Sequence, residues 1–199
     1  DAALSFSGLL VKSLGGASVK PYQPANIWNE VSLNGGLRYK RDSGDNLYRR
    51  SIYTYWKRSA PMPNMLIFDA PTREKCMIQR PVTNTPLQAL VVLNDPQFVE
   101  AARAFAQKMI VEGGNDDVSR INYGFKVALS RHATEEELSV IKNVLKNQIN
   151  SFGSDKEKAK QFLSVGEFKR DESLDLVEHA AWSVVAQILF NMDETLTRG

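Results

Sequence analysis

Two consecutive helix-start signals constrain this chain more than any other feature. Thr85 is a good N-cap residue, Pro86 suits the first helical position, and Gln88 can complete a capping box with Thr85. Asp95 and Pro96 then repeat the same arrangement. Because Pro96 has no N–H to donate to a continuing helix, the first helix must end and the chain must turn. The sequence therefore predicts two helices that meet at an angle.

Apolar residues recur at helical spacing through the rest of the C-terminal part. After the helix that follows the corner, we expect three more, with N-caps at Asp116 or Asp117, at Thr134 and at Ser173. The second should open with a capping box between Thr134 and Glu137. The third is apolar enough to lie at the centre of a bundle. Residues 191–199 are expected to form a short polar tail.

The segment from about 48 to 80 is where we expect any extended structure. Arg50–Arg58 alternates weakly and is rich in aromatic and β-branched residues, which favours a strand, although its apolar residues also fit one face of a helix. Met65–Phe68 has the composition of a buried strand or plug. The predicted fold class is therefore mainly α: a multi-helix bundle with short β-strands or extended segments confined to about 48–80.

The chain of 199 residues is expected to be a single domain and a fragment of a larger protein. It has no initiator Met, and residues 4–14 have the pattern of a helix cut near its beginning, which stops at Gly15 and Gly16. Within the domain we distinguish a motif-bearing part, residues 1–115, from a helical part, residues 116–199.

Composition excludes few classes of function. The net charge is only +2, although basic residues concentrate between Arg38 and Arg58. No apolar run approaches the length of a membrane span. Cys76 is the only cysteine, and we expect it to be buried and inert. His132 and His179 lack metal-ligand spacing, so no metal site is predicted and both are expected to be structural.

Polar and aromatic side chains near the prolines are the candidate ligand-binding residues. They are Arg49, Arg50, Tyr53, Trp56, Asp69, Arg73, Arg80, Asn84, Asn94 and Asp95. In one interpretation the charged groups are structural and pair with each other, with Glu74 or with backbone carbonyls. In the other they converge on an open cleft beside Trp56 or Tyr53, and the rings of Tyr53, Tyr55 and Trp56 can stack on sugars. If two carboxylates of this region hydrolysed a glycosidic bond, they would be Asp69 and Asp95, but Asp95 is better explained as an N-cap.

Three consecutive motifs carry a resemblance to a known family. They are YRRSIYTYWKR, PMPNMLIFDAPTREKC and RPVTNTPLQALVVLNDPQFVEAAR, flanked by SGLLVKSLGGASVKPYQPANIW and VGEFKRDESLDLVEHAAWSVVAQILFNMDETLTR. The chain resembles, over nearly its whole length, the C-terminal domain of unknown function of planctomycete-type, cytochrome-linked, exported multidomain proteins. The resemblance implies export to the periplasm or cell surface. It also implies upstream domains of the same chain as partners, a c-type haem domain among them, and a setting of polysaccharide use.

The leading interpretation is a helical scaffold or interaction domain without established activity. The alternative is a polysaccharide-binding or polysaccharide-acting module that uses the Arg/Asp/aromatic motif region. Whether the chain is an enzyme stays open, because no catalytic motif is recognised and the resemblance assigns no catalytic residue. No cofactor is expected in this fragment. Nucleic-acid binding through Arg38–Arg58 is disfavoured by the near-neutral net charge and the implied export.

Overall fold

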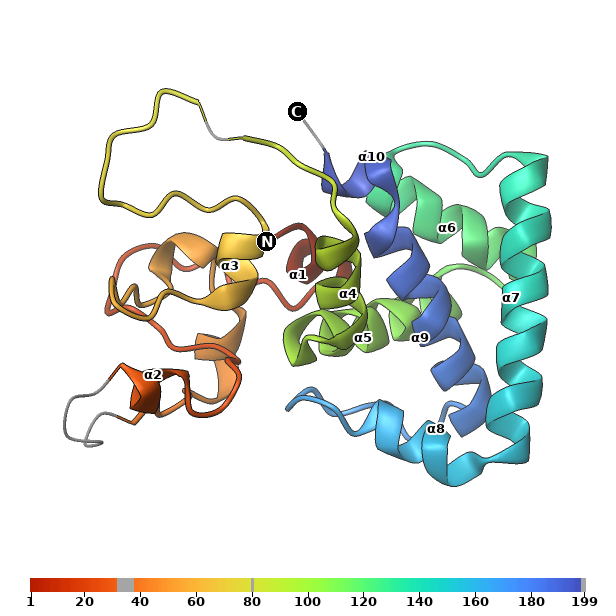
Figure 1. Cartoon of the computed structure of the whole chain (residues 1–199). Helices are drawn as coiled ribbons and strands as arrows, with labels where there is room; N and C mark the ends of the chain where they lie inside the picture. Colours follow the sequence, from red (N-terminus) through yellow and green to blue (C-terminus); the bar gives the residue numbers. More distant parts are fainter. Residues whose placement is uncertain (32–37, 80, 198–199) are drawn as a thin grey trace. The chain divides into compact units, whose positions relative to one another are not determined.

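The computed structural model describes residues 1–31, 38–79 and 81–197, and these residues are mainly helical (Figure 1). Their α-helices are α1 (Ala2–Ser7), α2 (Ile27–Glu30), α3 (Pro63–Ile67), α4 (Pro86–Asn94), α5 (Pro96–Glu112), α6 (Asp117–Leu129), α7 (Glu135–Ser154), α8 (Lys156–Leu163), α9 (Leu176–Asn191) and α10 (Asp193–Leu196). Two 3-10 helices, η1 (Gly44–Tyr48) and η2 (Ser51–Tyr53), add to them. The predicted fold class, a helical bundle, is confirmed.

The chain divides into two compact units. The first contains Asp1 and Leu10–Val91, and the second contains Ala2–Leu9 and Val92–Gly199. The N-terminal helix α1 therefore belongs to the second unit, and the boundary near residue 91 falls inside α4. Within the described ranges, none of the helices has the length and the apolar character that crossing a membrane requires.

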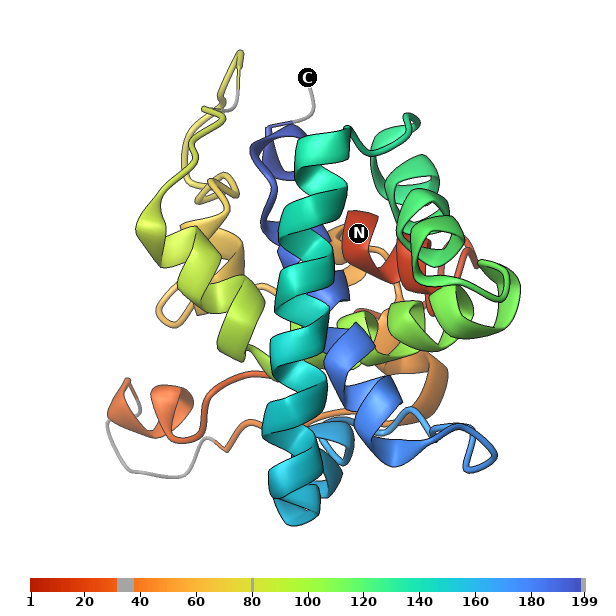
Figure 2. The same ribbon diagram turned by 90° about the vertical axis from the view of Figure 1, so that its right-hand side faces the viewer.

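Helices α5 and α9 form the centre of the second unit. Small residues are common among the buried positions of both helices and suit a close approach of the two backbones: Ala101, Ala102 and Ala104 on α5, and Ala180, Ala181 and Ala186 on α9. Phe105 of α5 stacks on Phe190 of α9 with 5.7 Å between ring centroids. Phe6 of α1 packs against both rings. Helix α7 runs alongside α9, as Figures 1 and 2 both show.

Capping fixes where the helices of the second unit begin. The carboxylate of Asp95 accepts from the N–H of Gln97 at the start of α5, and Asp116 accepts from the N–H of Ser119 at the start of α6. Both caps match the sequence prediction. The predicted capping box of Thr134 is also confirmed at the start of α7.

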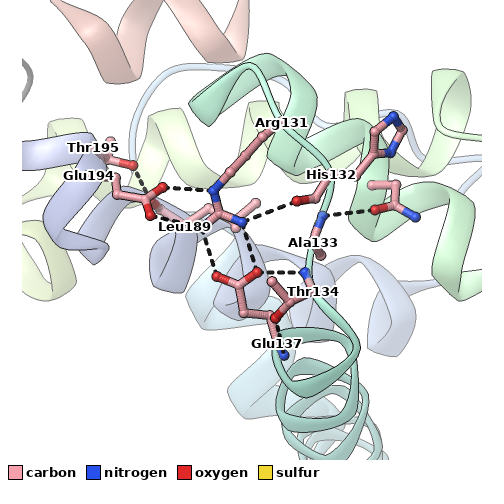
Figure 3. A network of polar contacts seen from close by, with 9 residues as sticks. Arg131, His132, Ala133, Thr134, Glu137, Leu189, Glu194 and Thr195 are labelled. Atoms are coloured by element: carbon pink, nitrogen blue, oxygen red, sulfur yellow. Dashed lines mark hydrogen bonds and ion pairs between the residues drawn. The ribbon is translucent and has the colours of Figure 1, made fainter.

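Arg131 connects the start of α7 to the end of the chain (Figure 3). Its guanidinium donates two hydrogen bonds of 2.8 Å to the carboxylate of Glu137 and two more, of 2.9 and 3.0 Å, to Glu194 of α10. The bonds from Arg131 lower the pKa of Glu137 to about 2. Because Glu137 also accepts from the N–H of Thr134, one carboxylate serves both the helix cap and the ion pair.

Two buried charged residues of α5 hold the segment that leads into α9. Glu100 and Arg103 are 0% and 2% exposed. One carboxylate oxygen of Glu100 accepts from the N–H groups of Glu167 and Phe168, each at 2.5 Å, and Arg103 donates to the carbonyls of Val165 and Phe168. Gly166 lies in this bonded segment and has a φ of +90°. A Cβ atom at this position would be 2.3 Å from the Glu100 carboxyl carbon.

Extended structure in the first unit is limited, in the part of the chain that is described, to two isolated bridges. Val11 pairs with Arg49, and Val19 pairs with Thr54. The strand predicted over Arg50–Arg58 is wrong. Its first residues form η2, because the N–H of Tyr53 bonds to the carbonyl of Arg50 and the N–H of Thr54 to that of Ser51.

Other local predictions are also wrong. Met65–Phe68 lies at the end of α3 instead of in a strand, because Pro63 at its first position starts a helical turn. The N-terminal helix stops at Ser7 instead of residue 14, since Gly8 takes the left-handed conformation with φ +81°. Asp175, not Ser173, caps α9, and it accepts from two N–H groups.

Besides α3, the described residues contain two more α-helices, α8 and α10, where no helix was predicted. Helix α8 has few apolar residues and begins at the cap Asp155. Helix α10 lies in the segment predicted to be a polar tail. It is one short turn, held by Arg131 through Glu194.

Gly166→Ala should destabilise the protein by more than about 2 kcal/mol, because alanine disfavours positive φ and its Cβ would collide with Glu100. The matched control is Gly153→Ala in α7, where a Cβ meets nothing within 4 Å and helix propensity should raise stability by about 0.5–1 kcal/mol. Urea unfolding of both variants measures the difference. Equal stability of the two would contradict the close contact.

His179 should make the protein less stable in mild acid. It is 0% exposed, its Nε2 lies 2.9 Å from the carbonyl of Arg103, and burial, aided by Arg170 and Arg103, lowers its pKa below 6.5. As the pH falls below 6.5, His179 is protonated in the unfolded chain before it is protonated in the folded protein. The stability that comes from burying the neutral imidazole is therefore fully present above pH 6.5 and is lost as the pH falls below it. Urea midpoints of the wild type and of the exposed control His132→Gln should fall in parallel between pH 7.5 and 5. A pH-independent midpoint would contradict the burial of a neutral imidazole.

Candidate functional site

Arg49, the first of the predicted site residues, clamps a loop of the first unit. Its guanidinium donates to the carbonyls of Ser13, Gly15 and Ala17 at 3.1, 2.6 and 3.3 Å. It also lies 3.9 Å from the ring centroid of Tyr53, whose hydroxyl accepts from the N–H of Gly15 at 2.9 Å. Arg49 and Tyr53 therefore act together on loop 13–17, and the guanidinium is directed at backbone carbonyls.

Trp56 and Arg73 form a second pair. The guanidinium of Arg73 lies 5.0 Å from the ring centroid of the half-buried Trp56. Arg73 is itself exposed, and its backbone has a positive φ of 63°, which is unusual for a residue other than glycine. Arg50 is also exposed, and a guanidinium nitrogen of Arg58 lies 3.5 Å from a carboxylate oxygen of Glu74. The exposed guanidinium of Arg73 therefore lies over the Trp56 ring near the surface of the first unit.

Asp69 belongs to a third group, which closes the base of a loop. Its carboxylate accepts from the backbone N–H and the hydroxyl of Thr83 at 3.0 and 2.7 Å. The amide nitrogen of Gln88, a residue 1% exposed, donates to that hydroxyl oxygen and to the carbonyl of Ile67. Gln88 and Thr85 also form the predicted capping box. Residues 69 and 83 are therefore tied together at the start of α4.

The other predicted site residues lie elsewhere in the chain or outside the described residues. Asn84 is an exposed residue just before α4, and Asn94 is the last residue of that helix. Asp95 serves as the N-cap of α5 in the second unit. Arg80 lies outside the described residues.

An aromatic cluster in the first unit joins Tyr55 to Trp28 and Tyr39, two residues that the sequence interpretation did not connect with it. Trp28 is 8% exposed, with its ring 5.2 Å from that of Tyr39 and 5.6 Å from that of Tyr55. The ammonium groups of Lys20 and Lys57 lie 5.9 and 4.6 Å from the Trp28 ring centroid. Tyr39 donates to the carbonyl of Pro21, and burial, with a smaller effect of Asp42, raises its pKa. In the sequence, the cluster is indicated only by aromatic residues and lysines in the same region. Their spacing follows no pattern that would predict a contact.

Exposed apolar residues are concentrated between residues 77 and 87. The exposed fractions are 48% for Met77, 108% for Ile78, 58% for Val82 and 54% for Leu87. The first three lie in the loop whose base Asp69 and Thr83 close, and Leu87 lies on α4. Cys76 in the same loop is exposed, so the expectation of a buried cysteine is wrong. The loop thus presents apolar side chains on a tied base.

The carboxylates show no catalytic pairing. Asp69 bonds to Thr83 and Asp95 caps a helix, and they belong to different units. Across the described ranges, no group of three or more His, Cys, Asp or Glu side chains is arranged to hold a metal ion. Of the two histidines, His179 is buried and His132 is exposed.

Comparison with known proteins identifies a family. The family model described as PSD1, protein of unknown function (DUF1553), matches residues 1–145. The chain belongs to this family. No curated protein and no solved structure matches the chain.

Arg49→Ala should release loop 13–17, because three backbone carbonyls lose their common donor. We expect a loss of about 1 kcal/mol in stability and faster hydrogen exchange at the N–H of Gly15. Native-state hydrogen exchange and urea unfolding measure the two effects. The control Arg50→Ala, at an exposed neighbour, should change stability by less than about 0.5 kcal/mol. Unchanged exchange at Gly15 in Arg49→Ala would show that the clamp is not formed.

Proposed function

We propose that the chain is a non-catalytic helical scaffold or interaction domain of an exported multidomain protein, with other domains of that protein as its partners. One observation carries this proposal: Met77, Ile78, Val82 and Leu87 are exposed on a loop and helix whose base is tied by hydrogen bonds. Large apolar side chains gathered in one segment are typical of a surface that another protein covers.

The tied base makes this segment suited to binding. A partner that covers a loop must offset the conformational entropy that the loop loses on binding. Here Asp69, Thr83 and Gln88 already fix both ends of the loop, so part of that entropy is lost during folding. The polar groups nearby are directed mostly at backbone atoms of the same unit, which supports a structural role for them.

The test is a titration of residues 1–199 with the separately produced remainder of the parent protein. Ile78→Ser and Val82→Ser should each weaken binding at least tenfold, because burying such a side chain contributes about 1.5–3 kcal/mol. Val140→Ser is the matched control, since Val140 on α7 is 61% exposed and Val82 is 58% exposed. Full affinity in both loop variants, or no association with the remainder, would refute the proposal.

A second candidate is polysaccharide binding by the first unit. This unit contains eight of the ten predicted site residues, namely Arg49, Arg50, Tyr53, Trp56, Asp69, Arg73, Arg80 and Asn84, whereas Asn94 and Asp95 belong to the second unit. The observation that favours it is the 42% exposure of Tyr55, whose ring lies 5.6 Å from Trp28. The cation–aromatic pair of Arg73 and Trp56 lies close by in sequence. Exposed aromatic rings of this kind are suited to stacking on sugars.

Native gel electrophoresis through soluble polysaccharides tests this candidate. Binding should retard the wild type, and Tyr55→Ala should migrate as it does without polysaccharide. The control is Ile52→Ala, because Ile52 is a 73% exposed apolar residue nearby. Equal retardation of Tyr55→Ala and the wild type would remove Tyr55 from the candidate site.

A further inference from the structure

The first unit has an excess of buried hydrogen-bond donors. Five of its buried side-chain nitrogen atoms have no hydrogen-bond partner within the described part of the chain: Gln23 Nε2, Trp28 Nε1, Arg49 Nε, Trp56 Nε1 and Lys57 Nζ. Buried polar groups in proteins are nearly always hydrogen-bonded, so a set of unpaired donors needs an explanation. Because all five are donors, the missing partners are acceptors.

Two of these donors lie at one aromatic ring. The Lys57 ammonium is 4.6 Å from the ring centroid of Trp28, and Trp28 Nε1 belongs to that same ring. The Lys20 ammonium lies 5.9 Å from this centroid and 5.3 Å from that of Tyr55. Two ammonium groups and an indole N–H are therefore gathered around Trp28, next to the partly exposed ring of Tyr55.

The chemistry of these groups favours an oxyanion. The face of an indole ring attracts a cation, but it offers no lone pair to the three N–H groups of an ammonium. A carboxylate or sulfate offers several acceptor oxygens and a compensating charge. The charge of the unit agrees, since residues 1 and 10–91 contain 12 Lys and Arg against 6 Asp and Glu.

Aromatic packing alone does not account for the cluster. A position that only packs against Trp28 would be filled best by an apolar side chain, because a buried ammonium without an acceptor opposes folding. Lys57 nevertheless places its Nζ there. Tyr55, a residue that is 42% exposed, adds a ring against which a sugar can lie, with its acidic group beside the Lys20 ammonium, which is 5.3 Å from the Tyr55 ring centroid.

We propose that Lys20, Trp28, Tyr55 and Lys57 bind the acidic group of a carboxylated or sulfated sugar, with the sugar ring against Tyr55. This inference rests on the polysaccharide-binding candidate function and specifies its ligand as anionic. No bond is made or broken, and the site is one of recognition.

Calorimetric titration with three oligosaccharides of equal length tests the ligand class. They are a hexuronic acid oligomer, its carboxyl-reduced neutral counterpart and a sulfated oligomer of a neutral sugar. At least one acidic oligomer should bind tenfold or more tightly than the neutral one, and its affinity should fall with added salt. Tighter binding of the uronate or of the sulfated oligomer then distinguishes the two sources of the oxyanion.

Lys57→Met is the decisive variant, because methionine keeps an apolar stem against Trp28 and removes the charge. It should weaken binding of the acidic oligomer at least tenfold, while the melting temperature without ligand stays equal to that of the wild type or rises. Lys12→Met is the matched control, since Lys12 is an exposed lysine of the same unit and should be dispensable for binding. Trp28→Phe, which removes the indole N–H and keeps a ring, should weaken binding as well.

The outcomes separate this inference from the function on which it rests. Equal binding of acidic and neutral oligomers would overturn the anionic site and leave polysaccharide binding intact. Binding of none of the three would overturn both. If Lys12→Met weakened binding as much as Lys57→Met, the attraction would be a general effect of charge and the site would be refuted. Undiminished binding by Lys57→Met together with a lower melting temperature would show that Lys57 is structural.

Discussion

The second unit depends on the hydrogen bonds that Glu100 and Arg103 make to residues 165–168. These bonds bring the segment before α9 against α5, so that α9 starts in the position from which it packs against α5. Removing one partner would leave a buried charge without its donors or acceptors, which is more costly than losing an ordinary hydrogen bond. Gly166 is required because the approach is too close for a Cβ atom. The core of α1, α5 and α9 is then completed by rings such as Phe105 and Phe190.

Features determined within a few residues could be predicted from the sequence. The caps Asp95, Asp116 and Thr134 were predicted because a cap and its N–H partner lie two or three residues apart. Features determined over long separations could not be predicted. Arg49 finds its carbonyls more than thirty residues away, and Glu100 finds its donors more than sixty residues away, so no local spacing indicates either contact. Helix α8 was missed for a related reason: it has few apolar residues, and its buried side chains are Ala159 and Leu163.

The motif region shows why residue types alone did not determine a site. Arg, Asp and Gln recognise backbone groups as readily as they recognise ligands, because the donors and acceptors are the same. Arg49 and Gln88 satisfy carbonyls, and Asp69 satisfies a backbone N–H. The aromatic cluster could not be assembled from the sequence either, since Trp28 and Tyr55 lie far apart in the chain and meet only after folding.

The first unit therefore combines loops tied by internal hydrogen bonds with side chains that its own fold does not fully use. Arg49 ties one loop and Asp69 ties another, so the backbone around them is fixed by internal bonds. On this framework Ile78 is fully exposed, and Lys57 has a buried ammonium without an acceptor in the described residues. Each arrangement has a cost for the isolated unit, because one leaves apolar area in water and the other leaves a buried donor without an acceptor. Both arrangements support the two proposals, that an apolar protein surface binds at the loop and an acceptor-rich group at the aromatic cluster.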